Sequence, residues 1–340
     1  MLRSGAITTL ESQAWLLYIA GLPTAWNVLM SSLTLPTVHP KVLRPGDAVA
    51  LVSPSGPVAA EKIEAAARVL ESWGLRPRIY PHAYERHSFY AGTDAQRISD
   101  LNHALGDPHI RAVICNRGGY GVQRILNEVD LEAVRRDPKL LSGFSDITAV
   151  HGLLWAQARL ASVHGPVANQ LGHNPLMASG LRHALMSTEP VLLQADPNAG
   201  TGSVRTRGRA TGTLLGGNLS MLSTCIGTPF MPDMDGAILL LEDVGEAAYR
   251  VDRLLTHLGN CGLLQRLNGI ALGDFSVPAH AAGSISPADV LLERLGSLGI
   301  AVLGGLPVGH GEVNQAVPLG TRAVLDVEAG TLLVESANVA

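Results

Sequence analysis

Short apolar runs alternate with amphipathic segments over the first half of the chain, and this alternation is the strongest constraint on the fold. The apolar runs at residues 48–52 and 111–115 each lead into a loop rich in Gly, Pro or Ser. Residues 61–73 and 93–105 carry apolar side chains at helical spacing. Strands separated by helices pair in parallel, because each crossover returns the chain to the same end of the sheet. The sequence therefore predicts an α/β fold with a parallel sheet that continues to about residue 165.

The second half of the chain breaks this alternation. Residues 171–210 hold many Gly, Pro and Arg residues and only one segment, near 175–186, with a helical pattern. A new block of apolar segments begins at residue 211, and its most apolar strand is expected at 237–241. A chain of 340 residues is long enough to bury two moderate cores. We therefore expect an extension at 1–40, an N-terminal domain at 41–170, a connecting region at 171–210 and a C-terminal domain at 211–340.

The first forty residues do not match the rest of the chain. Their apolar stretch at 15–22 is too short and too interrupted to span a membrane. Arg3 is the only early positive charge and Glu11 intrudes, which makes a poor signal peptide. Two interpretations stay open: a disordered extension, or a true translation start at Met30 with an error in the assigned gene start.

Charge and cysteine content narrow the class of protein. The formal net charge of −4 provides no basic surface for nucleic acid. The cysteines, Cys115, Cys225 and Cys261, are isolated in apolar surroundings and show no CxxC spacing. We interpret them as small core residues, with neither a zinc site nor disulfides. This composition is typical of a globular cytoplasmic enzyme.

Ser145 stands where a predicted strand turns into a predicted helix. An apolar segment at 140–144 precedes it and a helical pattern at 149–158 follows. A sharp turn at this point would present the serine hydroxyl outside the sheet, and the helix N-terminus would offer N–H groups to a developing oxyanion. The alternative is that Ser145 only caps the helix.

Two residues of the second block could complete a catalytic set. Glu242 directly continues the apolar run 237–241, and the carboxyl ends of strands are where α/β proteins place functional groups. His310 lies between two glycines, so its ring could be held in a cleft, although a surface histidine is the plainer interpretation. Nucleophilic catalysis by a serine needs an imidazole to take its proton and a carboxylate to orient the imidazole. Other histidines compete, notably His151 and His164, and we interpret His164 as structural or pocket-lining.

The glycine-rich turn at 118–121 has two interpretations. Such a turn between a strand and a helix could cradle a dinucleotide phosphate, but the GxGxxG spacing is absent and this is not the first strand. Alternatively, its backbone N–H groups could serve as oxyanion donors that face Ser145.

Taken in order, these motifs resemble the LD-carboxypeptidase family of serine peptidases, which contains the murein tetrapeptide carboxypeptidases and the microcin C immunity peptidases. The resemblance covers roughly residues 41–335. Its matching segments are 45–47, 53–56, 91–94, Arg97, 100–102, 117–121, 143–146, 164–166, 212–219, 241–243, 309–310 and 318–320.

The resemblance implies a fold and a site. The fold is an N-terminal Rossmann-like domain with a parallel sheet and a smaller C-terminal β-rich α/β domain. Ser145 is implied to be the nucleophile, Glu242 the acid and His310 the base, in a triad formed across the cleft between the domains. The implied oxyanion donors are the backbone N–H groups of Gly118, Gly119 and Asp146. No metal or cofactor is implied, and members are typically cytoplasmic homodimers.

The implied reaction hydrolyses the amide between an L-configured centre and a terminal D-residue. In muropeptides it releases D-Ala from the tetrapeptide recovered during cell-wall recycling. Arg117, Tyr120 and Asn218 are candidates for substrate binding; Arg117 could meet the terminal carboxylate, and a structural ion pair is equally open. Two alternatives remain: a microcin C immunity-like peptidase that cleaves aminoacyl-nucleotide conjugates, and a non-catalytic small-molecule-binding protein.

Overall fold

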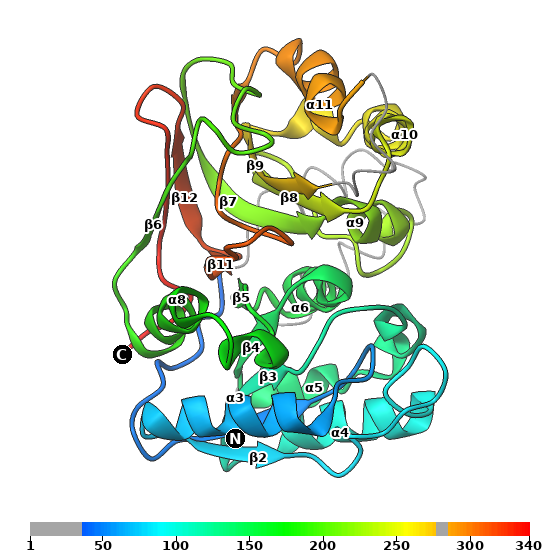
Figure 1. The fold of residues 1–340 in the computed structure, drawn as a ribbon, viewed down its shortest axis with the longest axis vertical. Coiled ribbons are helices and arrows are strands. Elements are labelled where there is room, and N and C mark those ends of the chain that lie inside the picture. Colours follow the sequence, from blue (N-terminus) through cyan, green and yellow to red (C-terminus); the bar gives the residue numbers. More distant parts are fainter. Residues whose placement is uncertain (1–35, 277–284) are drawn as a thin grey trace, which may run out of the picture. The chain divides into compact units, whose positions relative to one another are not determined.

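The structure is a computed structural model that describes residues 36–276 and 285–340. The alternatives for the N-terminal extension, including a start at Met30, therefore lie outside the described residues. Residues 37–340 form one unit, which contains two sheets (Figure 1). The predicted α/β class is confirmed, because a mostly parallel sheet is followed in the chain by a second, mixed sheet.

The first sheet has six strands in the order β11-β5-β4-β3-β1-β2. They are β1 (Ala48–Val52), β2 (Arg76–Ile79), β3 (Ile110–Cys115), β4 (Leu140–Gly143), β5 (Ser162–His164) and β11 (Val317–Leu319). All neighbours pair in parallel except β11, which is antiparallel to β5. β1 is apolar throughout because both faces of this sheet are covered: Ala50 and Val52 pack into one core, Val49 and Leu51 into the other.

Helices cover both faces of the first sheet, as the alternating pattern predicts. One core holds α3 (Ala60–Ser72), α7 (Ala168–Leu171) and α8 (Pro175–Met186); the other holds α4 (Asp94–Gly106), α5 (Leu131–Arg136) and α6 (Thr148–Ala158). A capping box between Thr93 and Gln96 fixes the start of α4. The helix expected near 175–186 is confirmed as α8.

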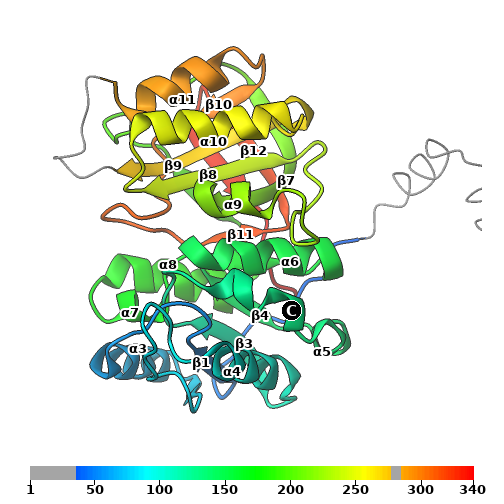
Figure 2. The ribbon, with the colours of Figure 1, turned by 90° about the vertical axis from the view of Figure 1, so that its right-hand side faces the viewer.

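The second sheet has seven strands in the order β10-β9-β8-β7-β12-β13-β6. They are β6 (Val191–Gln194), β7 (Arg209–Asn218), β8 (Ile238–Val244), β9 (Gly269–Ser276), β10 (Ala301–Leu303), β12 (Arg322–Asp326) and β13 (Thr331–Val334). β7 to β10 are parallel, whereas β12, β13 and β6 extend the sheet with antiparallel pairs. The helices α9 (Leu219–Cys225), α10 (Ala248–Asn260) and α11 (Pro287–Gly296) cover one face (Figure 2).

The chain passes between the two sheets more than once. β6 belongs to the second sheet although it lies in the region expected to be a connection, and β11 returns to the first sheet after β10 (Figure 1). Val317 and Leu319 of β11 also pack into the apolar core on the second sheet's helix-free face. The two sheets are therefore fastened together by strand pairing as well as by side-chain packing.

The segment after the glycine-rich turn departs from regular helix. It is a pair of 3-10 turns, Val122–Arg124 and Leu126–Glu128, and the α-helix starts only after Asp130 caps the N–H of Ala133. The left-handed backbone of Gly121 and the extended Val129 interrupt a continuous helix. The interpretation of Cys261 as a core residue is wrong, because it is exposed at the end of α10, whereas Cys115 and Cys225 are buried as expected.

Candidate active site

Ser145 lies on a strained turn between β4 and α6. It opens a 3-10 turn, Ser145–Ile147, with φ of 66°, a left-handed conformation that is uncommon for a residue other than glycine. The interpretation of Ser145 as a helix cap is wrong, because α6 is preceded by Ile147 and no side chain caps either segment. The Ser145 hydroxyl instead faces His310, with 3.1 Å between Oγ and Nε2.

Neighbouring residues shape this turn. A Cβ on Gly118 would lie 2.7 Å from Cβ of Ser145 and 3.0 Å from its Oγ, so the glycine turn packs directly against the serine. Asp146 is buried, and its Oδ2 accepts the Ser55 hydroxyl at 2.5 Å and the Val122 N–H at 2.9 Å. Burial raises the pKa of the Asp146 carboxyl although these hydrogen bonds oppose the shift. One side chain thus connects the serine turn to the loops on both sides of it.

A buried arginine fixes the glycine turn from the other side. Arg97 on α4 donates to the carbonyl oxygens of Pro54 at 2.5 Å and Gly121 at 2.9 Å, and it pairs with Asp94. The guanidinium therefore holds the 53–57 loop and the glycine turn at a fixed separation. This explains why the segment around Arg97 belongs with the site although it lies far from Ser145 in sequence.

Glu242 comes from β8 of the second sheet. The register between β8 and β9 shifts between Leu241 and Asp243, an irregularity of the kind that redirects side chains beside functional sites. The Glu242 side chain is completely buried, and its Oε2 lies 2.6 Å from Nδ1 of His310. The structure therefore brings Ser145, His310 and Glu242 into one hydrogen-bonded chain.

The loop before β11 holds His310 in place. Gly309 has φ of 107°, and a Cβ there would lie 2.6 Å from Oε2 of Glu242, so a side chain would collide with the carboxylate. Asn314 accepts the N–H of Gly309 at 2.9 Å, and the ring of Phe144 lies 4.7 Å from the His310 ring, measured between centroids. The contacts of Phe144 and Asn314 with the His310 loop were not predicted, because they join segments that are distant in the sequence.

Burial and charge set the protonation of this pair. Burial raises the pKa of Glu242, and the hydrogen bond and charge of His310 oppose the shift. For His310, burial alone lowers the pKa, but the hydrogen bond and charge of Glu242 outweigh it, so the pKa lies above the ordinary value of 6.5. The His310 side chain keeps 19% of its surface exposed, so a substrate can reach the imidazole.

Backbone N–H groups beside Ser145 are available to an anion. Within the described ranges, the N–H groups of Gly118 and Gly119 donate to no protein acceptor. Asp146 is the second residue of its 3-10 turn, a position whose N–H has no partner inside the turn. Free donors beside a nucleophile can stabilise the oxyanion of a tetrahedral intermediate.

The three candidate substrate-binding residues lie in different environments. Arg117 is exposed and donates to the carbonyl of Pro57 at 2.9 Å. Tyr120 is 58% exposed, and its ring lies against Tyr90. Asn218 is buried at the end of β7; its Nδ2 donates to Asp243 and its Oδ1 accepts the N–H of Met221, so both ends of its amide have protein partners.

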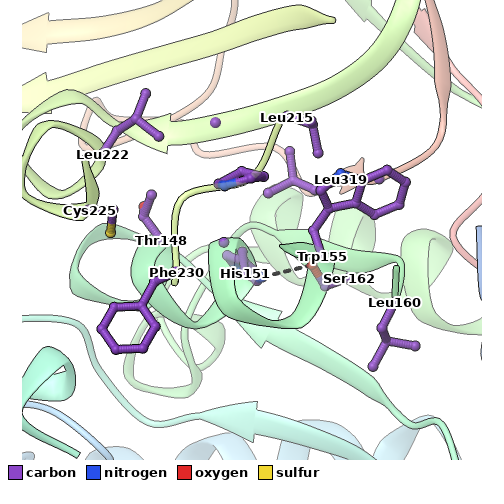
Figure 3. Close-up of a pocket in the computed structure, with 14 residues that line it drawn as sticks. Thr148, His151, Trp155, Leu160, Ser162, Leu215, Leu222, Cys225, Phe230 and Leu319 are labelled. Atoms are coloured by element: carbon purple, nitrogen blue, oxygen red, sulfur yellow. Dashed lines mark hydrogen bonds between the residues drawn. The ribbon is translucent and has the colours of Figure 1, made fainter. Parts of the chain in front are cut away.

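The two competing histidines are buried near the site. His151 on α6 is hydrogen-bonded to Ser162 Oγ (Figure 3), and its other ring nitrogen is hydrogen-bonded to the carbonyl of Gly143. It lines an internal cavity of about 10 Å³, a size that holds about one water molecule. Ser145, His310 and Glu242 do not line this cavity. His164 at the end of β5 lies behind Glu242, with 3.9 Å between its Nε2 and Oε1 of the carboxylate.

Residues 36–276 and 285–340 contain no group of His, Cys, Asp and Glu side chains that could hold a metal ion. Over the same ranges, no helix is long and apolar enough to cross a membrane.

The chain matches two family models. Residues 49–165 match the LD-carboxypeptidase N-terminal domain, and residues 211–325 match the LD-carboxypeptidase C-terminal domain. The chain belongs to the LD-carboxypeptidase family. It is therefore a serine-type LD-carboxypeptidase, a hydrolase, and the resemblance inferred from its motifs is confirmed.

Known proteins agree with this placement. This LD-carboxypeptidase is 35% identical to the murein tetrapeptide carboxypeptidase of Pseudomonas aeruginosa, over 82% of the chain and 92% of the relative. It is similar to the crystal structure of a muramoyltetrapeptide carboxypeptidase from Oxalobacter formigenes, with a TM-score of 0.76, 29% identity, and 86% and 100% of the two chains covered. It is also similar to an MccF-like protein from Bacillus anthracis, with a TM-score of 0.80, 25% identity, and 88% and 100% covered.

Proposed function

We propose that this LD-carboxypeptidase releases the terminal D-Ala from murein tetrapeptide, with Ser145 as nucleophile, His310 as general base and Glu242 as the acid that orients it. The observation that carries the proposal is the hydrogen-bonded chain from Ser145 Oγ through His310 to Glu242. A hydroxyl, an imidazole and a carboxylate in this order form the constellation of serine hydrolases. The murein tetrapeptide carboxypeptidase among its relatives supports the choice of substrate.

In the proposed mechanism, each residue of the hydrogen-bonded chain has a defined role. His310 Nε2 accepts the proton of Ser145 Oγ while the oxygen attacks the carbonyl carbon of the scissile amide. The resulting oxyanion accepts hydrogen bonds from the N–H groups of Gly118, Gly119 and Asp146. His310 then returns its proton to the leaving amine, and D-Ala departs.

Water completes the cycle. It attacks the acyl group on Ser145 while His310 again takes a proton, and the tripeptide leaves as the serine regains its hydrogen. Throughout, the buried Glu242 carboxylate accepts the Nδ1–H of His310 and stabilises the imidazolium that forms. The raised pKa of His310 agrees with this role.

The terminal carboxylate of the substrate needs a positive or N–H-rich partner. Arg117 adjoins the glycine turn and is exposed, so it can meet that carboxylate beside the oxyanion donors. Tyr120, exposed on the same turn, can line the pocket. The Asn218 amide is held by Asp243 and Met221, so we give Asn218 a supporting role at the end of β7. In the cell we place the enzyme in the cytoplasm as a homodimer that recycles muropeptides.

The MccF-like neighbour favours a second candidate, an aminoacyl-nucleotide conjugate as substrate. From the sequence we expect the stretches 171–210 and 275–290 to shape the leaving-group pocket, and residues 277–284 of the second stretch lie outside the described residues. Phe275 is the only aromatic residue in the sequence of these two stretches. A nucleotide base usually stacks on an aromatic side chain, so this composition favours the muropeptide.

The test compares three substrates with one enzyme preparation. The parent protein and Ser145→Ala are incubated with the tetrapeptide that ends in D-Ala, with its diastereomer that ends in L-Ala, and with an aminoacyl-nucleotide conjugate, and products are followed by mass spectrometry. We expect the parent to release D-Ala from the first substrate only, and Ser145→Ala to release none. Cleavage of the nucleotide conjugate alone would transfer the assignment to the second candidate.

A further inference from the structure

The buried carboxylate of Glu242 has one oxygen without a donor. Its Oε2 receives the Nδ1–H of His310, whereas its Oε1 has no hydrogen-bond partner in the described part of the chain. Directly behind it lies His164, whose two ring nitrogens also have no partner among the described residues. Both side chains are completely buried, and 3.9 Å separate Nε2 of His164 from Oε1 of Glu242.

The His164 ring and Oε1 of Glu242 are a possible donor and an acceptor that lie side by side in the interior without a hydrogen bond, which is unfavourable. Burying a carboxylate oxygen without a hydrogen bond costs free energy, and the low local dielectric makes the loss larger. The 3.9 Å separation is too long for a hydrogen bond, but a small rotation of either side chain closes it. Hydrogen bonds of catalytic groups are often long without substrate and shorten in the complex.

The surroundings of His164 decide which nitrogen carries its proton. Burial lowers the pKa of His164 well below its ordinary value, so the ring is neutral and carries a single N–H. A proton on Nδ1 would find no acceptor, and the lone pair of Nε2 would then face the carboxylate. A proton on Nε2 points toward Oε1 of Glu242 instead.

We propose that His164 is a positioning residue that donates its Nε2–H to Oε1 of Glu242 when the site engages its substrate. The hydrogen-bonded chain then has four members, with His164 behind Glu242, His310 and Ser145. This inference rests on the proposed function, because it assigns His164 to the same reaction. His164 does not touch the substrate; it acts by holding the carboxylate that holds His310.

Other nearby groups already have partners. Asn218 on β7 is the strand partner of Glu242 and helps to lower the pKa of its carboxyl, but its Nδ2 donates to Asp243 at 3.0 Å. His151 on α6, whose ring centroid lies 6.5 Å from that of His164, already bonds Ser162 and Gly143. Asp243 on β8 and Asp274 on β9 carry charges that act on His310, but a carboxylate cannot donate to Glu242 when it is ionised. The ring of Phe144 lies 5.9 Å from the His164 ring, measured between centroids, and a Cβ on Gly217 would lie 3.4 Å from Cδ2 of His164.

A hydrogen bond to Oε1 has a measurable effect on His310. It makes the Glu242 carboxylate less basic, so the carboxylate stabilises the protonated imidazole less strongly. Removing the donor should therefore raise the pKa of His310 further in the substrate complex and move the acidic limb of the kcat profile, which reports that complex, to higher pH. Because the hydrogen bond from His164 to Glu242 is strongest with substrate bound, its removal should lower kcat about ten- to a hundredfold and change KM little.

The experiment uses His164→Phe, which keeps the ring volume and removes the donor, and His164→Gln, whose amide nitrogen can take the place of Nε2. The pH profiles of kcat and kcat/KM are measured on murein tetrapeptide. We expect His164→Phe to lower kcat and to move the acidic limb of the kcat profile to higher pH, and His164→Gln to restore both. Parent-like values for His164→Phe, or equal losses in both variants, would overturn the proposal.

Two further measurements separate this role from simple packing. His151→Phe removes a second buried histidine of the same core; it should lower the unfolding temperature and leave the acidic limb unchanged. In the parent protein, ¹⁵N spectra of the imidazole should show His164 as the neutral Nε2–H tautomer, and an Nδ1–H tautomer would contradict the proposal. This measurement does not require His164→Phe to fold. Ser145→Ala tests the proposed function separately. If this variant keeps the activity of the parent protein, the proposed function is wrong, whatever the His164 variants show.

Discussion

The two sheets contribute to the site in different ways. The first sheet supplies Ser145 and its oxyanion donor Asp146 from one short connection, where β4 ends and α6 begins. The second sheet supplies Glu242 from inside a strand, and His310 follows 68 residues later in a loop. The nucleophile therefore lies on one short connection that neighbouring loops hold in place, whereas the acid and the base depend on an irregular strand register, on Gly309 against Glu242 and on Asn314.

This difference predicts which changes matter most. A substitution on the second sheet can leave the fold intact and still separate acid from base, since only one hydrogen bond joins Glu242 to His310. A substitution near Ser145 acts by displacing a strained turn that several segments hold.

Glu242→Gln tests the contribution of the second sheet. The amide keeps the shape of the side chain but cannot balance the charge of an imidazolium, and it can present a donor to Nδ1 of His310. We expect kcat to fall about ten-thousand-fold with an unchanged circular dichroism spectrum. A variant that retains more than a tenth of the parent kcat would show that Glu242 does not support His310.

Gly118→Ala tests the contribution of the first sheet. The new Cβ would lie 2.7 Å from Cβ of Ser145 and 3.1 Å from the carbonyl oxygen of Phe144, so the turn must move. We expect a loss of kcat of about a hundred- to a thousandfold, the size seen when an oxyanion donor is lost. The control is Gly106→Ala at the end of α4, where the nearest atom to a Cβ is 4.0 Å away; its kcat should match the parent.

The acidic limb of the pH–rate profile reports the pKa of His310, which depends on its pairing with Glu242. His310 must be neutral to accept the serine proton, and Glu242 raises its pKa despite the opposing effect of burial. Values of kcat/KM should therefore fall about tenfold per pH unit below a midpoint that lies above 6.5. An NMR titration of the His310 ring in Glu242→Gln should give a lower pKa than in the parent; an unchanged pKa would contradict the pairing.

The same shift predicts a pH dependence of stability. Because the pKa of His310 is raised in the folded state, its pairing with Glu242 stabilises the protein fully below the unfolded value of 6.5. This contribution is lost as the pH rises through the folded pKa. Urea unfolding across this range should show a smaller decline for Glu242→Gln than for the parent.

Asp146→Ala should have the smallest effect on rate and a clear effect on stability. It leaves the Ser55 hydroxyl and the Val122 N–H without their acceptor, which should cost about 1–3 kcal/mol of unfolding free energy. Burial raises the pKa of Asp146, so the parent loses part of this advantage as the pH rises through the folded value. The difference between the two proteins in urea unfolding should therefore shrink with rising pH. Asp130→Ala, which removes only the cap of α5, should cost about 1 kcal/mol of unfolding free energy.

Local sequence predicted the parts of the molecule that local physics determines. The apolar run of β1, the helical spacing of α4 and the strand–turn–helix around Ser145 were readable because burial on two faces, capping and turn geometry act over a few residues. The role of Ser145, Glu242 and His310 as a set was a hypothesis from pattern and resemblance, and their roles in catalysis remain a prediction.

Other features could not be predicted because they depend on distant segments. β2 reads Arg-Pro-Arg-Ile and has few apolar residues because it is an edge strand, and β11 has only three residues and forms by pairing with β5. Cys261 is exposed because it lies at the end of α10, a position that its neighbours in the sequence do not indicate. The juxtaposition of His164 and Glu242 needs two sheets to meet, and no spacing in the sequence records it.

The central claim is that residues from the two sheets act as a single catalytic unit, and a double-mutant cycle tests it most directly. Release of D-Ala from murein tetrapeptide is measured for the parent, Ser145→Ala, His310→Ala and the double variant. We expect each single variant to lose at least about ten-thousand-fold in kcat and the double variant to lose no more than either one, because residues of one unit are strongly non-additive. Losses that multiply in the double variant would show that Ser145 and His310 act independently and would contradict the account.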